Sequence, residues 1–320
     1  MPEAGVVELH GVTKRFAGHT AVNDLSLTIP RGAIYGLLGP NGAGKSTTIR
    51  MIMSILLPDA GRIALFGGRQ SGKDLSHRIG YLPEERGLYK KMRVVDLLVF
   101  LAEIKGVARG VARRSAHEWL GRLGLSDWEL KRADDLSKGM QQKVQFIATV
   151  LHRPELLILD EPFSGLDPVN AQVMKDTVVE LARAGTTILF STHIMEQAEK
   201  LCDAVCIIAR GTKVVDGPLA EVKRRHGGSH VVVAVERREG GADRVLGDRR
   251  LVARADDYGG YAELELATGA DPQDVLSGLL QAGARVTRFE IAEATLHKIF
   301  IDMVGPDAAA ARAVGDGAHA

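Results

Sequence analysis

The chain has 320 residues, enough for about two domains, and its 41 basic and 40 acidic side chains give a net charge of +1 at neutral pH. This balance provides no global electrostatic case for binding nucleic acid or an acidic membrane surface, and a hydrophobic content of 45% is ordinary for a soluble globular protein. The only two cysteines, Cys202 and Cys206, have no second pair with which to form a metal site. We therefore read them as small buried residues in a reducing compartment.

No apolar run in the sequence approaches the roughly 18 residues that a membrane helix requires. The run from Val94 to Ala102 comes closest and contains Asp96. The first five residues lack the basic and apolar regions of a secretory signal. We therefore expect a chain that does not itself cross a membrane.

The first elements in chain order are two alternating segments, residues 6–9 and 25–29, which predict antiparallel strands. Phe16 lies in a turn expected between them. The spacing leaves two interpretations of this aromatic ring open: it stacks on an adenine base, or it closes a small β-sheet.

A phosphate-binding loop of the form G-x-x-x-x-G-K-[ST] follows a short apolar run at residues 33–38 and precedes an apolar helical pattern that continues to Pro58. Its glycines allow backbone N–H groups to converge on phosphate oxygens, and the helix N-terminus adds further donors. We expect Lys45 to reach the β- and γ-phosphates, the Ser46 hydroxyl to ligate Mg²⁺, and Thr47 to support the α-phosphate side. The loop comprises Gly39, Pro40, Asn41, Gly42, Ala43, Gly44, Lys45, Ser46 and Thr47.

The middle of the chain changes from strand patterns at residues 61–68 and 79–85 to helical spacing from about 94 to 124, which predicts a mainly helical insert within an α/β domain. A further helix is expected to begin at Ser137. This serine is placed either as a simple N-cap or, together with Gly139 and the helix N-terminus, as part of an anion site.

Two carboxylates, Asp160 and Glu161, follow four consecutive apolar residues that predict a strand buried on both faces. They stand where α/β sheets bind ligands, beyond the carboxyl end of a strand. Asp160 is suited to hold Mg²⁺ and Glu161 to polarise an attacking water. Residues 186–193 predict a neighbouring buried strand that ends in His193, for which we expect a γ-phosphate contact.

In order and spacing these motifs resemble the ATP-binding subunits of ABC transporters over roughly residues 5–225. The resemblance implies an α/β P-loop NTPase with a RecA-like parallel sheet core, an antiparallel β subdomain and a helical insert at about 84–150, using ATP and Mg²⁺. It matches residues 39–47 to the Walker A loop, residues 156–161 to the Walker B strand and residues 136–142 to the ABC signature. It also matches residues 164–167, which include Asp167, to the D-loop, His193 to the switch histidine and Phe16 to the aromatic residue of the A-loop.

Two positions depart from the family pattern. The signature reads Leu-Ser-Lys-Gly-Met instead of LSGGQ; Ser137 and Gly139 remain, while Lys138 adds a positive charge. Glu84 stands where the Q-loop glutamine is expected. A carboxylate there can still face Mg²⁺, and it changes the charge around the attacking water.

The resemblance also implies partners. In this family two nucleotide domains pair head to tail, so that each ATP lies between one subunit's Walker A loop and the other's signature helix. We accordingly expect a homodimer or a heterodimer with a paralogous chain, docked on a polytopic membrane permease at the cytoplasmic face of the membrane, with no nucleic acid partner. Hydrolysis then removes the link that the γ-phosphate makes between the two surfaces.

Residues 226–304 predict a smaller α+β accessory domain, with strands at 231–235, 251–253, 262–266 and 285–291 and helices at 271–280 and from 296 onward. It is similar to the C-terminal domain of bacterial ABC subunits linked to sodium or drug export, most clearly at residues 293–300. We expect a packing, dimer-stabilising or regulatory role. The Ala/Gly-rich residues 305–320 are expected to be disordered.

The leading hypothesis is an ATPase subunit that powers a membrane exporter. An alternative is a soluble ABC ATPase acting in translation or DNA repair, although such proteins usually carry two nucleotide domains or long coiled coils. A third is a non-hydrolysing ATP-binding module, given the altered Q-loop and signature.

Overall fold

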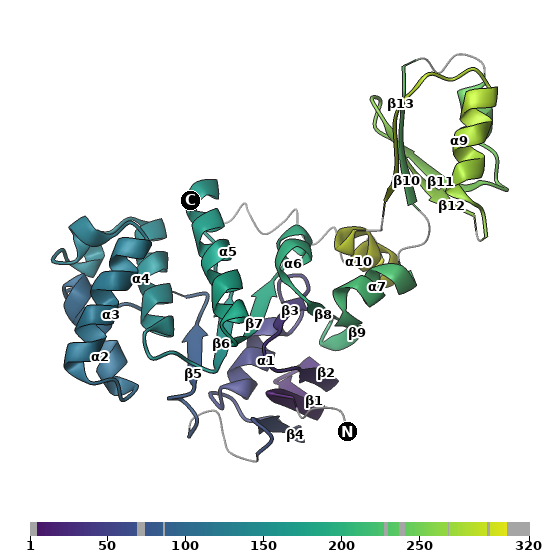
Figure 1. Ribbon diagram of the computed structural model, residues 1–320. Coiled ribbons are helices and arrows are strands. Elements are labelled where there is room, and N and C mark those ends of the chain that lie inside the picture. Colours follow the sequence, from purple (N-terminus) through teal and green to yellow (C-terminus); the bar gives the residue numbers. More distant parts are fainter. Residues whose placement is uncertain are drawn as a thin grey trace. The chain divides into compact units, whose positions relative to one another are not determined.

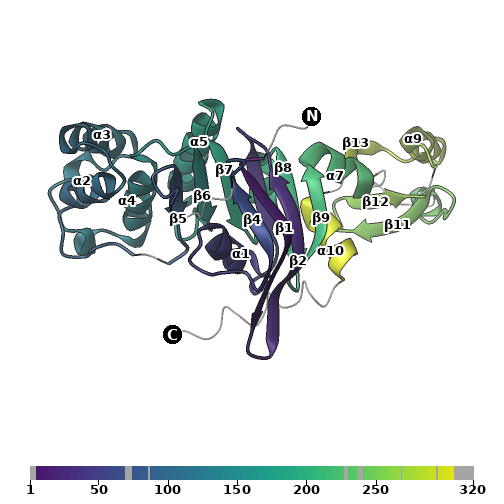
Figure 2. The ribbon, with the colours of Figure 1, turned by 90° about the horizontal axis from the view of Figure 1, so that it is seen from below.

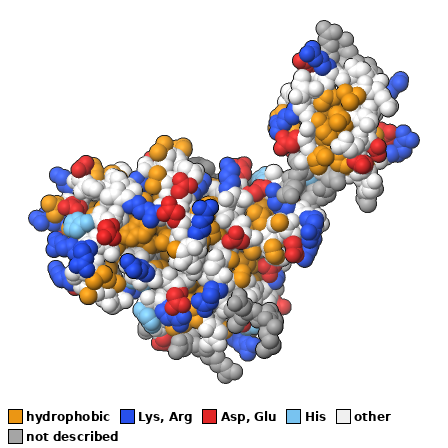
Figure 3. Space-filling view, in the orientation of Figure 1, with side chains coloured by type: hydrophobic (Ala, Val, Ile, Leu, Met, Phe, Trp, Pro, Cys, Tyr) orange, Lys and Arg blue, Asp and Glu red, His pale blue; other side chains and the backbone are white. Residues whose placement is uncertain are grey.

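A computed structural model describes residues 5–68, 74–85, 87–226, 230–236, 241–267, 269–292 and 295–305 of the chain. The chain forms two compact units that divide between Gly217 and Pro218 (Figure 1). Within the described residues, no helix is both long and apolar enough to pass through a bilayer. Basic and acidic side chains are interspersed over the face seen in Figure 3, in line with the balanced net charge.

A six-stranded sheet with the order β5-β6-β7-β3-β8-β9 forms the centre of the first unit. The five strands from β5 to β8 in this order are mutually parallel. Every residue of β3, β6, β7 and β8 is buried, as expected where both faces of a parallel sheet are covered. The bounds are β3 (Ile34–Leu38), β5 (Ile79–Leu82), β6 (Leu156–Asp160), β7 (Thr187–Thr192), β8 (Ala204–Ala209) and β9 (Thr212–Pro218).

An antiparallel sheet of order β2-β1-β4 accompanies the parallel one: β1 (Val7–Phe16), β2 (His19–Ile29) and β4 (Ala60–Leu65). Its inward side chains share a core with the parallel sheet and with α1 (Lys45–Ile52). This helix is shorter than the apolar pattern up to Pro58 suggests, because the chain reaches the left-handed region at Ser54, with φ 56°. The expected antiparallel pairing of residues 6–9 and 25–29 is confirmed for residues 7–9.

The helical insert consists of α2 (Val94–Ile104), α3 (Arg109–Arg122) and α4 (Lys138–Val150), which group beside the sheets in Figures 1 and 2. Their apolar faces pack together, and Trp119 meets Phe146 edge to face with ring centroids 6.3 Å apart. Two further helices, α5 (Pro168–Arg183) and α6 (Met195–Leu201), follow β6 and β7. This arrangement confirms the expected fold class.

Sequence reading did not include β8, whose residues Ala204–Ala209 sit directly beside β3 in the sheet. Six apolar residues in a row are the signal that identifies such a buried parallel strand. The strand also explains the two cysteines: Cys206 belongs to it and Cys202 precedes it, and both are buried. Burial raises the pKa of both thiols.

The second unit contains a four-stranded antiparallel sheet of order β11-β12-β10-β13. The helices α8 and α9 contribute to one apolar core with this sheet. The elements are α7 (Leu219–His226), β10 (His230–Val235), α8 (Ala242–Leu246), β11 (Val252–Asp257), β12 (Ala262–Leu266), α9 (Pro272–Gln281), β13 (Val286–Ala292) and α10 (Leu296–Val304).

The unit begins at Pro218, eight residues before the domain start expected at residue 226. The difference arises because α7 contacts α10, which ends the same unit. The basic residues Lys223, Arg224, Arg225 and His226 form the last turn of α7. Apart from Gly305, the tail expected to be disordered at 305–320 lies outside the described residues, as do Glu293 and Ala294.

Candidate functional site

The phosphate-loop sequence connects β3 to α1, as its flanking patterns indicate. Two of its glycines are required by close backbone approach. A Cβ on Gly39 would lie 2.2 Å from the Ile208 carbonyl oxygen, and one on Gly44 would lie 2.4 Å from that of Ala21. Both residues also have positive φ, at 152° and 107°. The loop therefore fits against β8 and β2 only with glycine at these positions.

Lys45 begins α1 and is only 6% exposed. Its Nζ donates hydrogen bonds to the carbonyl oxygens of Gly39, at 2.8 Å, and Pro40, at 3.2 Å. Burial lowers the pKa of this lysine, while the carboxylates of Glu161, Asp160 and Glu84 oppose that shift. The ammonium group is thus held inside the loop, facing the acidic residues.

One pocket of about 480 Å³ unites the loop with residues distant in sequence. The pocket is lined by Phe16, His19, Ala21, Asn41, Gly42, Gly44, Lys45, Ser46, Thr47, Glu84, Asp160 and Glu161. Of the site residues expected from the sequence, this set brings together the aromatic Phe16, most of the loop and all three acids. Gly39, Pro40 and Ala43 shape the loop without lining the pocket.

Asp160 and Glu161 occupy different environments although they are adjacent. Asp160 ends β6, is 2% exposed, and accepts a hydrogen bond from the Ser191 hydroxyl on the neighbouring strand β7. Glu161 follows the strand with φ 47°, a left-handed conformation that is uncommon outside glycine. Its amide donates to the Ser191 carbonyl at 3.1 Å. The turn lets two consecutive carboxylates line the same pocket instead of pointing to opposite faces.

Glu161 is oriented by three donors from the end of β7. The Thr192 hydroxyl donates to its Oε2 at 3.0 Å, and the His193 amide donates to its Oε1 at 2.9 Å. The His193 ring nitrogen Nδ1 lies 2.6 Å from the same Oε1. With an ionised Glu161, Nδ1 carries the proton and the ring tautomer is set. The expected adjacency of the Asp160 and His193 strands is confirmed by the β6–β7 pairing.

The acids outnumber the cations in this pocket. Three carboxylates, of Glu84, Asp160 and Glu161, face the single ammonium of Lys45. Burial, followed by repulsion from Asp160 and Glu161, raises the pKa of Glu84. An excess of oxygen donors and negative charge beside the Ser46 hydroxyl suits a hard divalent cation such as Mg²⁺.

Ser137, Gly139 and Asp167 do not line this pocket. Ser137 is the N-cap of α4 and accepts a hydrogen bond from the Met140 amide at 3.3 Å. Asp167 is the N-cap of α5 and accepts one from the Asn170 amide at 3.0 Å, which lowers the pKa of its carboxyl. Both side chains are at helix starts, separate from the site formed by the loop and the acids.

Two buried glutamines on α4 were missed in the sequence. Gln142 donates to the Pro162 carbonyl at 3.0 Å, and Gln145 donates to the Glu85 carbonyl at 3.2 Å. They link the helix that begins at Ser137 to the segments that follow Glu161 and Glu84. Their positions among the buried apolar residues Val144, Phe146 and Ile147 are the signal that could have identified them.

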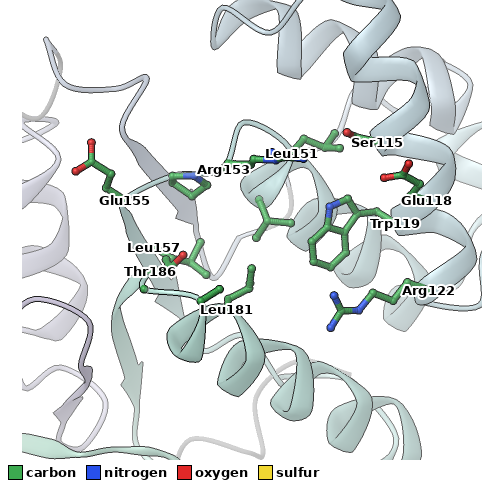
Figure 4. Close-up of a pocket in the computed structure, with 14 residues that line it drawn as sticks. Ser115, Glu118, Trp119, Arg122, Leu151, Arg153, Glu155, Leu157, Leu181 and Thr186 are labelled. Atoms are coloured by element: carbon green, nitrogen blue, oxygen red, sulfur yellow. The ribbon is translucent and has the colours of Figure 1, made fainter.

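A larger pocket, of about 540 Å³, lies at the other end of the sheet strands, between α3, α5 and the start of β6 (Figure 4). Trp119, Leu151, Leu157 and Leu181 supply much of its lining. Its Arg122 pairs with Glu180 and lies over the Trp119 ring. No phosphate-loop residue and no cluster of acids is among its lining residues. The smaller pocket is therefore the candidate functional site, although its volume is lower.

Comparison with known proteins agrees with this geometry. A family model described as "ABC transporter" matches residues 22–164, and one described as "ATP-binding protein DrrA1-3-like, C-terminal domain" matches residues 217–304. The uncharacterized ABC transporter ATP-binding protein YhaQ of Bacillus subtilis is 45% identical over 92% of this chain and 97% of its own length.

Two further relatives show the same pattern. The daunorubicin resistance ATP-binding protein DrrA3 of Streptomyces coeruleorubidus is 31% identical over 94% of this chain and 96% of its own. A solved structure of the ATP binding subunit of an ABC transporter superposes with a TM-score of 0.64 at 31% identity, over 69% of this chain and 92% of that one. The chain thus belongs to the ABC transporter ATP-binding proteins, as an ATP-hydrolysing subunit with a DrrA-like C-terminal domain.

Proposed function

We propose that this chain powers export by a membrane-embedded permease, by closing as a dimer around ATP and reopening after hydrolysis. The observation that supports this most strongly is the pocket in which Lys45, Ser46, Asp160 and Glu161 converge at the carboxyl ends of β3 and β6. Binding beyond the carboxyl ends of parallel strands is the general rule for α/β sheets. Export, in place of import, is proposed from the drug-resistance relative described above.

In this proposal the loop amides and Lys45 bind the phosphates, and Phe16, which is 46% exposed at the pocket's rim, stacks on the base. Ser46 and Asp160, with Glu84, offer oxygen ligands to Mg²⁺, which when bound neutralises charge on the phosphates. Among the described residues, no group of three or more His, Cys, Asp or Glu side chains is placed to hold a metal ion. We propose that phosphate oxygens and water complete the coordination, as is usual for Mg²⁺.

Glu161 is proposed to polarise the attacking water. Its Oε1 already accepts two hydrogen bonds from His193, and its Oε2 accepts one from Thr192. A carboxylate has about four acceptor positions, so one on Oε2 is left for the water. His193 then acts as the group that holds Glu161 in place. We propose that it also contacts the γ-phosphate when nucleotide is bound; His193 itself is not among the residues that line the pocket.

We propose a dimer because some of the expected ATP-binding residues do not line the nucleotide pocket of their own chain. Ser137 and Gly139 start a helix whose N-terminal amides suit a phosphate, and they do not line their own chain's pocket. We propose that they complete the site of a second copy or of a paralogous chain. The same pairing would bring Asp167 to the interface.

The alternative, an ABC ATPase acting on the ribosome or on DNA, has less support. The net charge of +1 provides no electrostatic footprint for nucleic acid. The match of residues 217–304 to a DrrA-like domain favours a transporter. We place the working subunit at the cytoplasmic face of a membrane, where ATP is available, through its permease.

The proposal is tested by expressing the chain with the permease encoded beside it and isolating membranes. Co-purification with a polytopic partner, and ATP hydrolysis that changes when the partner is present, are expected. Recovery with ribosomes or DNA and without any membrane protein would contradict the transporter assignment. The control is Lys45→Ala, which should keep the association and lose the hydrolysis.

A further inference from the structure

Among the described strands of the second unit, β13 lies at one edge of the sheet. β13 (Val286–Ala292) bonds to β10 along its inner edge. Among the described residues, no strand lies on its other side. An open edge of this kind presents N–H and C=O groups to any strand of matching length. One irregularity, at Thr287, lies near its start, so the residues around Phe289 form a regular strand.

The charges on this strand are arranged symmetrically about Phe289. Arg288 and Glu290 flank it on the outer face of the sheet and pair with each other, Nη2 to Oε2 at 2.5 Å. Their side chains are 54% and 55% exposed. An antiparallel copy of the strand, related by a two-fold axis through Phe289, places Arg288 opposite Glu290 of the second copy. Glu290 then stands opposite the other Arg288.

The placement of opposite charges on either side of Phe289 distinguishes β13 from an edge strand whose charges prevent association. Edge strands usually resist association because like charges would meet across the new ladder. Here the two-fold arrangement brings opposite charges together twice, and such cross-strand pairs stabilise an antiparallel ladder. Ile291, which is 58% exposed, would be partly covered by the same pairing.

The opposite edge, β11, is a matched comparison. It carries a similar pair, Arg254 Nε to Asp256 Oδ1 at 3.0 Å. However, the Arg249 side chain already donates to the Ala253 carbonyl at 3.1 Å, and the pairing with β12 is irregular between Val252 and Arg254. One acceptor on that edge is occupied, so β11 is the poorer template.

From these observations we propose that the C-terminal unit self-associates through antiparallel β13–β13 pairing about Phe289, joining two copies of the chain in one continuous sheet. The pairing does not involve the nucleotide pocket. It therefore predicts an association that requires neither ATP nor Mg²⁺, and it can fail without affecting the proposed hydrolysis. Because the strand is short, we expect a weak dimer, with a Kd on the order of 10 to 100 µM.

The test is sedimentation of the full chain without nucleotide, with folding of each variant checked by circular dichroism. Arg288→Glu and Glu290→Arg each replace two attractive pairs by two repulsive ones. Each variant alone should associate at least about tenfold more weakly than the parent.

Two charge combinations should restore the association. An equimolar mixture of the two single variants should associate again, since a strand with two acidic side chains beside Phe289 then faces a strand with two basic ones. The double variant R288E/E290R should dimerise like the parent, because the exchange keeps opposite charges across the two-fold axis.

The control is Arg254→Glu on the other edge, which should leave association unchanged. A parent chain that stays monomeric up to concentrations well above the expected Kd would overturn the proposal. So would a dimer that survives both single substitutions, or a mixture that behaves like its separate components. Loss of association in Arg254→Glu alone would assign the interface to β11 and reject β13.

Discussion

All buried polar side chains that the structure describes lie in the unit of residues 5–217, and the core of the unit of residues 218–305 is apolar. In the first unit Lys45, Asp160, Glu161 and Ser191 are each less than 9% exposed and hydrogen-bond with other side chains or with the backbone. In the second, charged residues form exposed ion pairs such as Arg288–Glu290. Buried polar groups are costly unless they are satisfied, so their concentration in the first unit agrees with the position of the candidate site in that unit.

The largest expected effect comes from removing the buried cation of the first unit. Lys45→Ala leaves the three facing carboxylates without a compensating charge and removes the ammonium that would meet the phosphates. ATP affinity should fall at least about 100-fold, and hydrolysis with it. Fluorescent nucleotide titration measures this. Arg50→Ala, on the same helix but outside the pocket lining, is the control, and unchanged affinity in Lys45→Ala would reject the loop assignment.

The next effect concerns the group that holds Glu161. His193→Ala removes the 2.6 Å ring contact to Glu161 and should lower kcat by about 10- to 100-fold, with a much smaller change in ATP affinity. The control is His117→Ala, which removes a ring contact of the same length to Glu129 in the helical insert. If both substitutions affect kcat equally, or His193→Ala affects only binding, the positioning role is wrong.

In the second unit a core substitution should affect stability and leave catalysis intact. Leu264 on β12 is fully buried in the apolar core, so Leu264→Ala should destabilise that unit by about 2 to 5 kcal/mol. Calorimetry should show a lower Tm for one unfolding transition, and the nucleotide affinity should remain at the parent value. Leu280→Ala, at a 59% exposed position, serves as the control. A large loss of ATP affinity in Leu264→Ala would show that the two units are not functionally separable.

The smallest effect is expected at Glu84. Its folded pKa is raised, so the folded state binds this proton more tightly than the unfolded state does. The favourable contribution is complete below the unfolded pKa and is lost as pH rises through the folded pKa. Glu84→Gln should therefore raise Tm at neutral pH by only about 1 to 2 °C in the absence of Mg²⁺, because Glu84 is shielded on its pocket side alone and remains accessible to solvent, which screens its charge.

The Tm advantage of Glu84→Gln should disappear as the pH is lowered below about 4, where the parent carboxyl is protonated in both states. Thermal melts across this pH range measure it. An advantage that grows on acidification would have the opposite sign and would contradict the electrostatic account. Glu85→Gln provides the control at the neighbouring position, since Glu85 does not line the pocket.

The sequence was sufficient to predict the parts of the site that are formed by residues close together in the chain. The loop at Lys45 and the acids at Asp160 and Glu161 were predictable because each motif is contiguous and has a strand beside it. The adjacency of the strands that carry Asp160 and His193 was predicted, whereas the contact of the His193 ring with Glu161 was not, because the sequence assigned His193 to the γ-phosphate. Gln142 and Gln145 were not predictable in this way, since their partners are carbonyl groups 20 and 60 residues away in the chain.

The unit boundary, the length of α1 and the strand order were harder to predict from the sequence for a similar reason. The unit boundary at Pro218 depends on α7 meeting α10, which are separated by the whole second sheet in the sequence. The length of α1 depends on one residue, Ser54, adopting a left-handed conformation that an apolar pattern does not reveal. The open edge of β13 became evident only once the strand order was known.

Glu161→Gln tests most directly whether Glu161 is the carboxylate that activates water. With ATP and Mg²⁺, we expect hydrolysis to fall at least about 100-fold while ATP binding persists and an ATP-bound dimer accumulates. Glu129→Gln, which alters a second glutamate that contacts a histidine ring at 2.6 Å, should hydrolyse ATP normally. Hydrolysis by Glu161→Gln at the parent rate would contradict the account.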